Sequence, residues 1–277
     1  LIDRWVQRYS VGVTYRKDTY NEEPNLQSPS QLPPDQTIAA PFIRYEVVED
    51  AYEQYKNMNL IERPEYFVLG VQSSVQLGHS WTAFGSTEDL WLYSASASDG
   101  FRMPSGGILL ASASTSGQSG YGPTNSQARS GSVKYYSHPD SRTLLYTSLA
   151  ADSLKDATQS TQLVLGGDTG LRGYPRNYQS GDRRVLLNVE GRVYTDWYPL
   201  RLFRVGGAVF YDLGRAWGGP NANTENAGWL DDVGFGLRIL SARSTFGNVL
   251  HIDLAFPLNH DPNIRRVQFL VTTRVAF

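Results

Sequence analysis

The final segment of the chain, Arg266–Phe277, alternates between an apolar and a polar face. One face holds Val267, Phe269, Val271, Thr273, Val275 and Phe277, and the other holds Arg266, Gln268, Leu270, Thr272, Arg274 and Ala276. In a soluble sandwich the apolar face of such a strand packs on a core and the charged face meets water. In a membrane barrel the apolar face meets lipid and the polar face lines the interior. The choice between these two arrangements determines which functions are possible.

The composition narrows the class of protein. The chain has 277 residues, is 40% hydrophobic and 19% charged, and has a formal net charge of −2. This length fits one large all-β domain or two small ones, and the near-neutral charge argues against nucleic acid as the main partner. Cys is absent, which excludes a disulfide framework, a thiol nucleophile and a thiolate metal site. The absence of an apolar run of transmembrane length excludes a spanning helix.

Segments of about ten residues with period two recur along the chain, separated by polar stretches rich in Gly and Pro, and they predict about twelve strands. Only Val47–Met58 has a trace of helical periodicity. The predicted strands are Tyr9–Arg16, Pro41–Glu49, Tyr66–Leu77, Leu90–Ser98, Gly107–Ser116, Ser126–Tyr136, Arg142–Ala151, Arg184–Thr195, Leu202–Leu213, Asp232–Leu240, Val249–Phe256 and Arg266–Phe277.

The charged residues of the later strands share the face opposite the apolar residues. Arg192, Arg238 and Arg274 all have this parity, as does Asp253. A charge on the lipid face near the middle of a bilayer would cost about 2–4 kcal/mol. This parity, together with 17 Tyr and 6 Trp that suit interfacial girdles, favours a transmembrane barrel over the alternative of a soluble β-sandwich or barrel.

The lengths of the connections alternate between long and short, with Asp50–Glu65 as the exception. Long extracellular loops and short periplasmic turns are typical of outer-membrane barrels. An even number of strands places both termini on the periplasmic side. We therefore expect an all-β fold, a transmembrane antiparallel up-and-down β-barrel of about twelve strands, with residues 1–277 as a single domain in the bacterial outer membrane.

Three motifs follow one another in the second half of the chain. The long loop Asp152–Arg183 contains the run Leu-Gly-Gly-Asp-Thr-Gly-Leu-Arg-Gly-Tyr-Pro at 165–175; the next strand contains Asn-Val-Glu-Gly-Arg at 188–192, and the strand after it contains Val-Phe-Tyr-Asp-Leu-Gly at 209–214. Over Leu163–Phe277 this set resembles the superfamily of outer-membrane assembly and secretion barrels that includes BamA, TamA and FhaC. The resemblance implies an extracellular loop that folds back into the lumen with an Arg172-Gly173-Tyr174 tip.

The chemistry of these residues agrees with that implication. Glu190 and Asp212 have the inward parity to offer carboxylates to Arg172, and a bidentate Arg–carboxylate pair would pin the loop in one position. Gly173 lets the backbone pass close to the wall, and Pro175 stiffens the exit. The alternative is a Gly-rich surface turn whose arginine is solvated.

The resemblance implies a non-enzymatic barrel that inserts, assembles or exports proteins. It also implies a weak seam between Tyr9–Arg16 and Arg266–Phe277, with Phe277 as a targeting signal. The expected partners are outer-membrane lipid and a protein client, or a periplasmic or passenger domain fused upstream of Leu1; no cofactor and no nucleic acid are expected. The family's barrels usually have sixteen strands, so the chain is either a shortened barrel or a smaller natural branch.

Two other function classes fit a barrel of this length. A barrel enzyme of the phospholipase, lipid A deacylase or protease type would place His with Ser or Asp at the outer rim. The candidates are His79, beside Ser80; His138, in a predicted periplasmic turn; His251, two residues before Asp253; and His260. A passive pore or anchor is the third class, since the Ser/Ala-rich middle strands would admit water. No His/Asp/Glu cluster has the spacing of a metal site.

Overall fold

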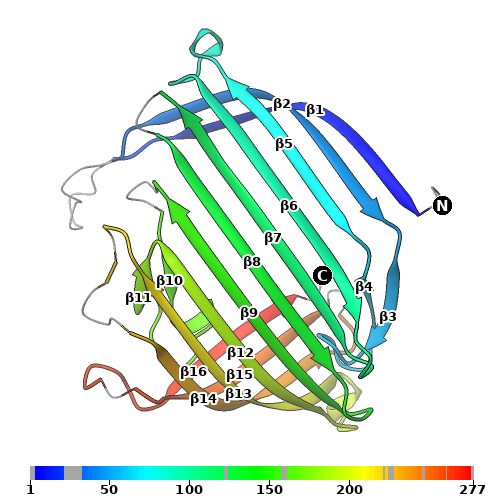
Figure 1. The fold of residues 1–277 in the computed structure, drawn as a ribbon. Coiled ribbons are helices and arrows are strands. Elements are labelled where there is room, and N and C mark those ends of the chain that lie inside the picture. Colours follow the sequence, from blue (N-terminus) through cyan, green and yellow to red (C-terminus); the bar gives the residue numbers. More distant parts are fainter. Residues whose placement is uncertain are drawn as a thin grey trace.

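The chain folds into one large, strongly curved antiparallel sheet (Figure 1). The computed structural model describes residues 4–21, 33–121, 124–156, 161–220, 222–223, 228–244, 247–259 and 261–275. Within these ranges the secondary structure is strand with three short 3-10 turns and no α-helix. No helix in this part of the chain is long and apolar enough to cross a membrane.

The order of the strands in the sheet follows the chain, and each strand is antiparallel to its neighbours, as predicted. The twelve strands are β1 (Trp5–Asp18), β2 (Gln36–Glu49), β5 (Gln72–Ser80), β6 (Leu90–Arg102), β7 (Ile108–Gly120), β8 (Ser126–Ser137), β9 (Thr143–Lys155), β12 (Arg183–Tyr194), β13 (Phe203–Trp217), β14 (Leu230–Ser241), β15 (Asn248–Pro257) and β16 (Gln268–Val275). Eleven of the predicted strands correspond to these with shifts at their ends.

Two edges bound the sheet, at β1 and at β16. Within the described ranges these two strands are not paired with each other. Closure of the barrel and the seam between Tyr9–Arg16 and Arg266–Phe277 therefore stay predictions. Phe277 itself lies outside the described residues.

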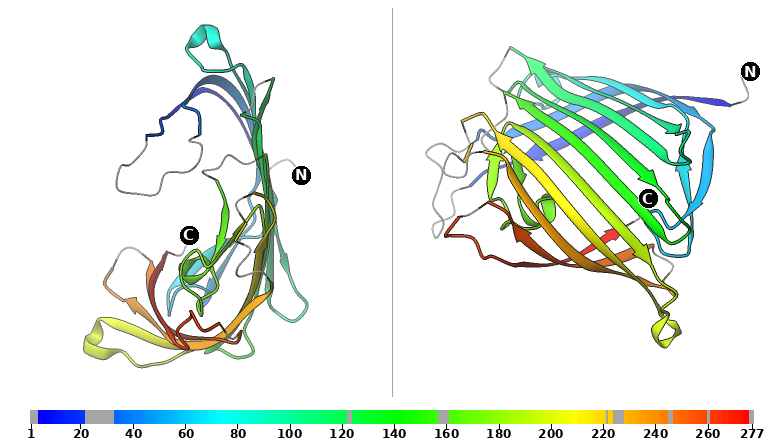
Figure 2. Two further views of the ribbon diagram at one scale, coloured as in Figure 1. Left: turned by 90° about the vertical axis from the view of Figure 1, so that its left-hand side faces the viewer. Right: turned by 60° about the horizontal axis from the view of Figure 1, so that its bottom comes forward.

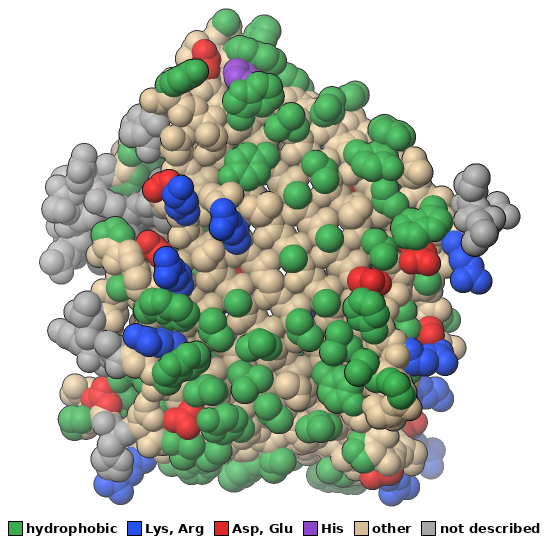
Figure 3. Space-filling view, in the orientation of Figure 1, with side chains coloured by type: hydrophobic (Ala, Val, Ile, Leu, Met, Phe, Trp, Pro, Cys, Tyr) green, Lys and Arg blue, Asp and Glu red, His purple; other side chains and the backbone are tan. Residues whose placement is uncertain are grey.

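The convex face of the sheet is apolar. Val209 lies opposite Phe235, Phe235 opposite Leu254, and Leu254 opposite Phe269, which makes an apolar row across four strands. Val209, Phe235 and Phe269 are 64%, 51% and 67% exposed, although apolar side chains of this size are usually buried. Hydrophobic side chains cover much of this face, and most charged ones lie toward the left and right margins of the view (Figure 3).

The concave face is polar, and serine lines its middle strands. Ser114 of β7 lies between Ser96 and Ser130 of the neighbouring strands, and the hydroxyls of Ser112 and Ser132 are hydrogen bonded at 2.8 Å. The predicted wall of small residues is therefore two-sided, with serine toward the interior and alanine on the convex face.

A hairpin lies between β2 and β5 along the chain and forms a separate two-stranded sheet, while β2 and β5 pair directly with each other. It consists of β3 (Tyr52–Lys56) and β4 (Pro64–Val68). The trace of helical periodicity at Val47–Met58 does not correspond to a helix, because Tyr52 and Gln54 pair with Val68 and Tyr66 in extended conformation. The single strand predicted at Tyr66–Leu77 is wrong.

The predicted strand is divided at a corner around Gly70. A Cβ there would lie 2.8 Å from both the Cβ and the carbonyl oxygen of Glu49, so the chain passes too close to β2 for a side chain. The amides of Leu69 and Val71 bond to Ala51 O and to the Glu49 carboxylate, at 2.8 and 3.1 Å. This bonding turns the chain out of the hairpin and into β5.

Two of the three buried apolar clusters in the described part of the chain lie at opposite ends of the strands. We name the end where the β3–β4 hairpin lies the hairpin end, and the other the loop end. The hairpin-end cluster comprises Met58, Leu60, Ile61, Phe67, Ile108, Tyr136, Leu144, Tyr194, Leu240 and Val249. The loop-end cluster comprises Leu165, Leu171, Tyr174, Leu186, Ala216, Leu230 and Ile264.

Candidate functional site

The segment 166–175, here called the insert, lies on the concave side of the sheet (Figure 2). The short strands β10 (Leu163–Leu165) and β11 (Gln179–Gly181) pair at its base, and the 3-10 turn η2 (Gly167–Thr169) opens it. The amide of Gly167 donates to the carbonyls of Leu171 and Tyr174, both at 2.8 Å. Gly166 has a φ of +126°, and a Cβ there would meet Pro175 O at 1.9 Å. Only glycine permits this tight fold.

Arg172 places its guanidinium among three carboxylates from three strands. Its Nε and Nη2 donate to the two oxygens of Asp212 at 2.7 and 2.9 Å, which is the bidentate geometry that positions a guanidinium most firmly. Its Nη1 donates to Glu190 Oε2 at 2.9 Å and to Asp253 Oδ2 at 3.4 Å. The guanidinium also lies over the ring of Phe210, with Cζ 3.4 Å from the centroid.

All of these charged groups are buried. Arg172 and Glu190 are each 3% exposed, and Asp212 is fully buried. Although burial opposes its charge, the carboxylates of Asp212, Glu190 and Asp253 raise the pKa of Arg172, so the guanidinium stays charged at every accessible pH. The insert is therefore fixed to the wall by charge-assisted hydrogen bonds in a site largely excluded from water.

Glu190 is the acceptor that the arginines share. Its Oε2 accepts from Arg172, and its Oε1 accepts from Arg192 Nε at 2.8 Å and from Arg238 Nη2 at 3.0 Å. Arg238 also donates from Nη1 to Asp253 Oδ1 at 2.5 Å. Three guanidinium groups and three carboxylates thus form one buried network across β12–β15 and the insert.

Gly173 and Tyr174 hold the rest of the insert. The amide of Gly173 donates to Asp232 Oδ2 at 2.9 Å, and a Cβ at Gly173 would lie 2.5 Å from the Cβ of Asp232. The hydroxyl of Tyr174 donates to Asp231 O at 2.9 Å. Burial raises the pKa of Tyr174 to about 12, so this donor keeps its proton. The amide of Asn188 adds a bond to Gly170 O at 2.9 Å.

Two glycines of β14 leave room for the network. A Cβ at Gly234 would lie 2.3 Å from Cζ of Phe210, and one at Gly236 would lie 1.9 Å from Oδ1 of Asp253. Both glycines belong to the concave face. The small residues at 234 and 236 thus let the neighbouring strands project Phe210 and Asp253 toward Arg172.

A second segment enters the interior from the hairpin end. We call residues 57–63, between β3 and β4, the tip. The carbonyl of Met58 accepts from Arg192 Nη1 at 2.8 Å and from Tyr194 Oη at 3.1 Å. Met58 and Ile61 are each 1% exposed. The connection Asp50–Glu65, which breaks the alternation of loop lengths, therefore has a structural role.

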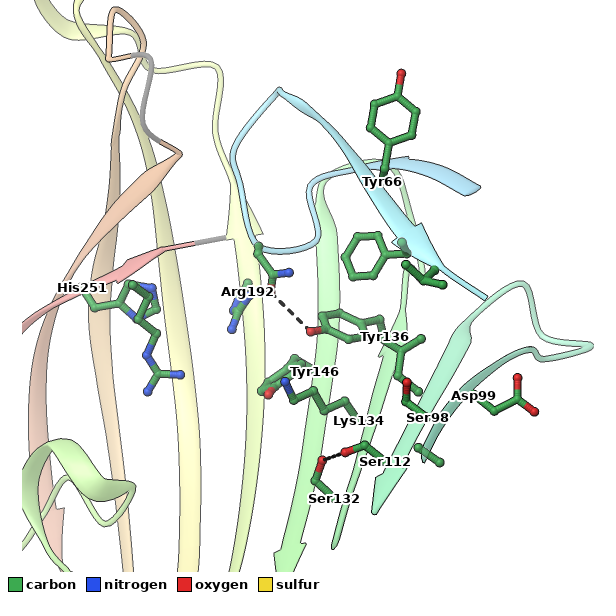
Figure 4. Close-up of a pocket in the computed structure, with 16 residues that line it drawn as sticks. Tyr66, Ser98, Asp99, Ser112, Ser132, Lys134, Tyr136, Tyr146, Arg192 and His251 are labelled. Carbon is green, nitrogen blue, oxygen red and sulfur yellow. Dashed lines mark hydrogen bonds between the residues drawn. The ribbon is translucent and has the colours of Figure 1, made fainter. Parts of the chain in front are cut away.

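A cavity of about 520 Å³ lies beside the tip, on the serine-lined side of the interior. In Figure 4 the side chains of Lys134, Tyr136 and Arg192 point into one space, whereas Tyr66 and Asp99 point away from it. Arg274 also lines this cavity, and in the described part of the chain it has no acidic partner within salt-bridge distance.

The structure brings together most of the residues that the sequence selected. Arg172, Glu190 and Asp212 lie in contact, and Arg192, Arg238 and Asp253 extend the network around them; Arg274 lies apart, in the cavity. Phe210 and Asn188 lie within the motifs at 209–214 and 188–192, but the sequence did not predict their contacts with the insert, and it did not select Asp232 as a site residue. For Asp232 the only available signal was its inward parity, which marks a residue as interior without naming its partner.

The histidines selected for a barrel enzyme have other environments. The ring of His79 lies 4.6 Å from the rings of both Trp81 and Trp91, and the hydroxyl of Ser80 donates to Glu88 O at 2.8 Å. His138 Nε2 lies 3.1 Å from Asn57 O. His260 lies outside the described residues. No group of three potential metal ligands occurs among the residues with described positions.

The comparisons with known proteins give a likeness of fold. No protein family matches the sequence, and no curated protein does. Among solved structures, CdiB from Escherichia coli superposes with a TM-score of 0.56 at 13% sequence identity. The match covers 99% of this chain and 50% of CdiB, so the chain spans half the length of that protein. At this identity the match shows the fold alone.

The buried position of Arg172 makes a stability prediction. Arg172→Ala leaves Asp212, Glu190 and Asp253 with too few cations, and we expect a loss of about 3–5 kcal/mol, as for other broken buried pairs. The matched control is Arg176→Ala, because Arg176 is 73% exposed and, among the described residues, pairs only with Asp168; its loss should stay below about 1 kcal/mol. Urea unfolding in detergent micelles measures both, and equal losses would contradict the docked geometry.

The close approach at Gly173 gives a second prediction. Gly173→Ala forces a Cβ against Asp232, and overpacking of this kind costs about 1–3 kcal/mol. We expect the insert to loosen, so that trypsin cleaves after Arg172, a bond protected in the parent protein; mass spectrometry of the fragments identifies the bond. Gly131→Ala is the control, because the nearest atom to its Cβ is 3.8 Å away. Cleavage after Arg172 at the parent rate in Gly173→Ala would show that the insert is not packed there.

Proposed function

We propose that the chain is the barrel of an outer-membrane system that secretes or inserts proteins, with a protein client as its partner. The observation that supports this most is the burial of Arg172 on Asp212 and Glu190, because these are the residues that the resemblance to the BamA, TamA and FhaC superfamily selects. The fold match to CdiB agrees with the architecture that this function requires. No step of this function requires an enzyme active site.

The distribution of side chains supports a membrane location. The convex face is apolar and the interior holds the buried charges, which is the arrangement of an outer-membrane barrel. Trp197 follows β12 at the hairpin end, and Trp229 precedes β14 at the loop end; they are 63% and 50% exposed. Tryptophans at both ends of the strands suit the two interfaces of a bilayer. In this arrangement the hairpin end, where β1 begins and β16 ends, is periplasmic.

The insert would act as a brace or plug of the interior. Its contacts join β12, β13 and β15 through one guanidinium, so a client can pass only if this network rearranges or if the free side of the interior suffices. β1 and β16 are the edges that must meet, directly or through further strands, to close the barrel.

A passive pore is the second candidate, and the serine-lined wall of β6–β8 favours it. A pore of this kind would conduct ions steadily and would have no client. A parent protein that conducts no steady ion current in planar bilayers would contradict the passive pore.

The membrane location predicts a larger loss of stability for arginine on the convex face than on the concave face. Val209→Arg places a charge on the convex face and should reduce stability in lipid vesicles by about 2–4 kcal/mol. Ser114→Arg places the same charge on the concave face, and we expect a change below about 1 kcal/mol, because the interior is wet there. Folding yield in vesicles, read as heat-modifiable gel migration, measures both. Equal tolerance of the two variants would contradict a lipid-facing convex surface.

The secretion role is tested in cells that make the full-length protein. Deletion of the gene should remove one or a few proteins from the culture medium or cell surface, as seen by quantitative mass spectrometry. The parent gene should restore them, and the Arg172→Ala gene should restore them poorly. An unchanged set of exported proteins would contradict the proposal, and a joint fall of all outer-membrane barrels would instead indicate general barrel assembly.

A further inference from the structure

We infer that the tip, residues 57–63, is a second closing segment that acts at the hairpin end, in series with the insert, and that Glu190 and Arg192 couple the two. This inference rests on the proposed function, since it assumes that the interior is the path of transport. It gives the exceptional connection Asp50–Glu65 a role in gating.

The tip spans the mouth of the curved sheet. Its buried side chains Met58, Leu60 and Ile61 share one apolar cluster with Ile108 of β7 and Val249 of β15. Leu144, Tyr194 and Leu240, from the strands between, belong to the same cluster. A turn that merely connected two strands would leave such residues in solvent, so these contacts place the tip across the interior.

Polar contacts fix the tip at several points. Arg63 Nη2 donates to Ala242 O at 2.7 Å, beyond the end of β14, and the His138 ring lies within hydrogen-bond distance of Asn57 O. Glu65 accepts the amides of Met58, Asn59 and Leu60 at 2.9–3.1 Å. This carboxylate satisfies three consecutive donors, and such buried donors are costly to leave unpaired. The conformation of the tip is therefore fixed both by its own hairpin and by its contacts with the wall.

The insert and the tip block different levels of the same interior. On β12, Leu186 belongs to the cluster around the insert, and Tyr194 belongs to the cluster around the tip. Glu190 lies between them on the same face of the strand. Because the two segments pack in separate clusters, release of one loosens the other through Glu190 but does not by itself open the level that the other closes.

A chain of contacts joins the two segments. Arg172 of the insert donates to one oxygen of Glu190, and Arg192 donates to the other oxygen. Arg192 uses its Nη1 for the Met58 carbonyl. Arg192 is thus a positioning residue. When Arg172 is released, the freed oxygen of Glu190 can attract Arg192 and draw it away from the Met58 carbonyl of the tip.

The series arrangement is tested by conductance in planar bilayers with four proteins. These are the parent chain, Arg172→Ala, a tip variant with Met58→Ser and Ile61→Ser, and their combination. We expect the conductance of Arg172→Ala and of the tip variant to stay within about threefold of the parent conductance, because each keeps one end closed. The combined variant should conduct at least about tenfold more than the parent. Full opening by Arg172→Ala alone, or a combination that stays closed, would overturn the inference. Heat-modifiable migration verifies that each variant is folded.

The coupling has a readout that does not depend on transport. Hydrogen exchange of the amides of Met58, Asn59 and Leu60 in detergent should accelerate at least about fivefold in Arg172→Ala, because opening equilibria of neighbouring units are linked. Arg184→Ala is the matched control, since Arg184 pairs with Asp152 at 2.8 Å, away from Glu190. Unchanged exchange of the tip in Arg172→Ala would overturn the coupling, whereas failure of the secretion experiment alone would leave this result standing.

Discussion

The structure depends on one buried guanidinium. Arg172 joins a loop to carboxylates on β12, β13 and β15, and burial of such charges is unfavourable unless every partner is present. A buried ion pair of this kind adds little net stability but strongly penalises any other arrangement of its partners. The glycines at 234 and 236, the ring of Phe210 and the close approach at Gly173 all follow from the need to bring this side chain to Asp212 and Glu190.

The network also divides the interior. The side bounded by β12–β15 is filled from end to end by the loop-end cluster, the charged groups around Glu190 and the hairpin-end cluster. The side bounded by β5–β8 is lined by serine and has open space. Since both sides share one apolar outer surface, the charges and the polar wall are accommodated only toward the interior, which is the inverse of a soluble core and the arrangement that the proposed membrane location requires.

The sequence predicted the strands best where the two faces differ most. Val209 and Asp212, or Phe269 and Arg274, have opposite chemistry, so their parity fixed the strand and its orientation. The hairpin was not predicted, and Tyr66–Leu77 was predicted as one strand, because the hairpin depends on pairing between Tyr52 and Val68 and on the crowding at Gly70, which are contacts made by folding. Glu190 and Asp212 were predictable from motif order and parity. The tip was not, because nothing local in Met58 or Ile61 distinguishes a buried turn from an exposed one.

The most direct test of this account is a double-mutant cycle between Arg172 and Asp212. Arg172→Gln, Asp212→Asn and the double variant would be unfolded with urea in the same detergent. We predict that the double variant loses at least about 2 kcal/mol less than the sum of the two single losses, because each single change leaves a buried charge without its partner. Additive losses would show that the two side chains do not interact, and would contradict the docking of the loop on the concave face of the sheet.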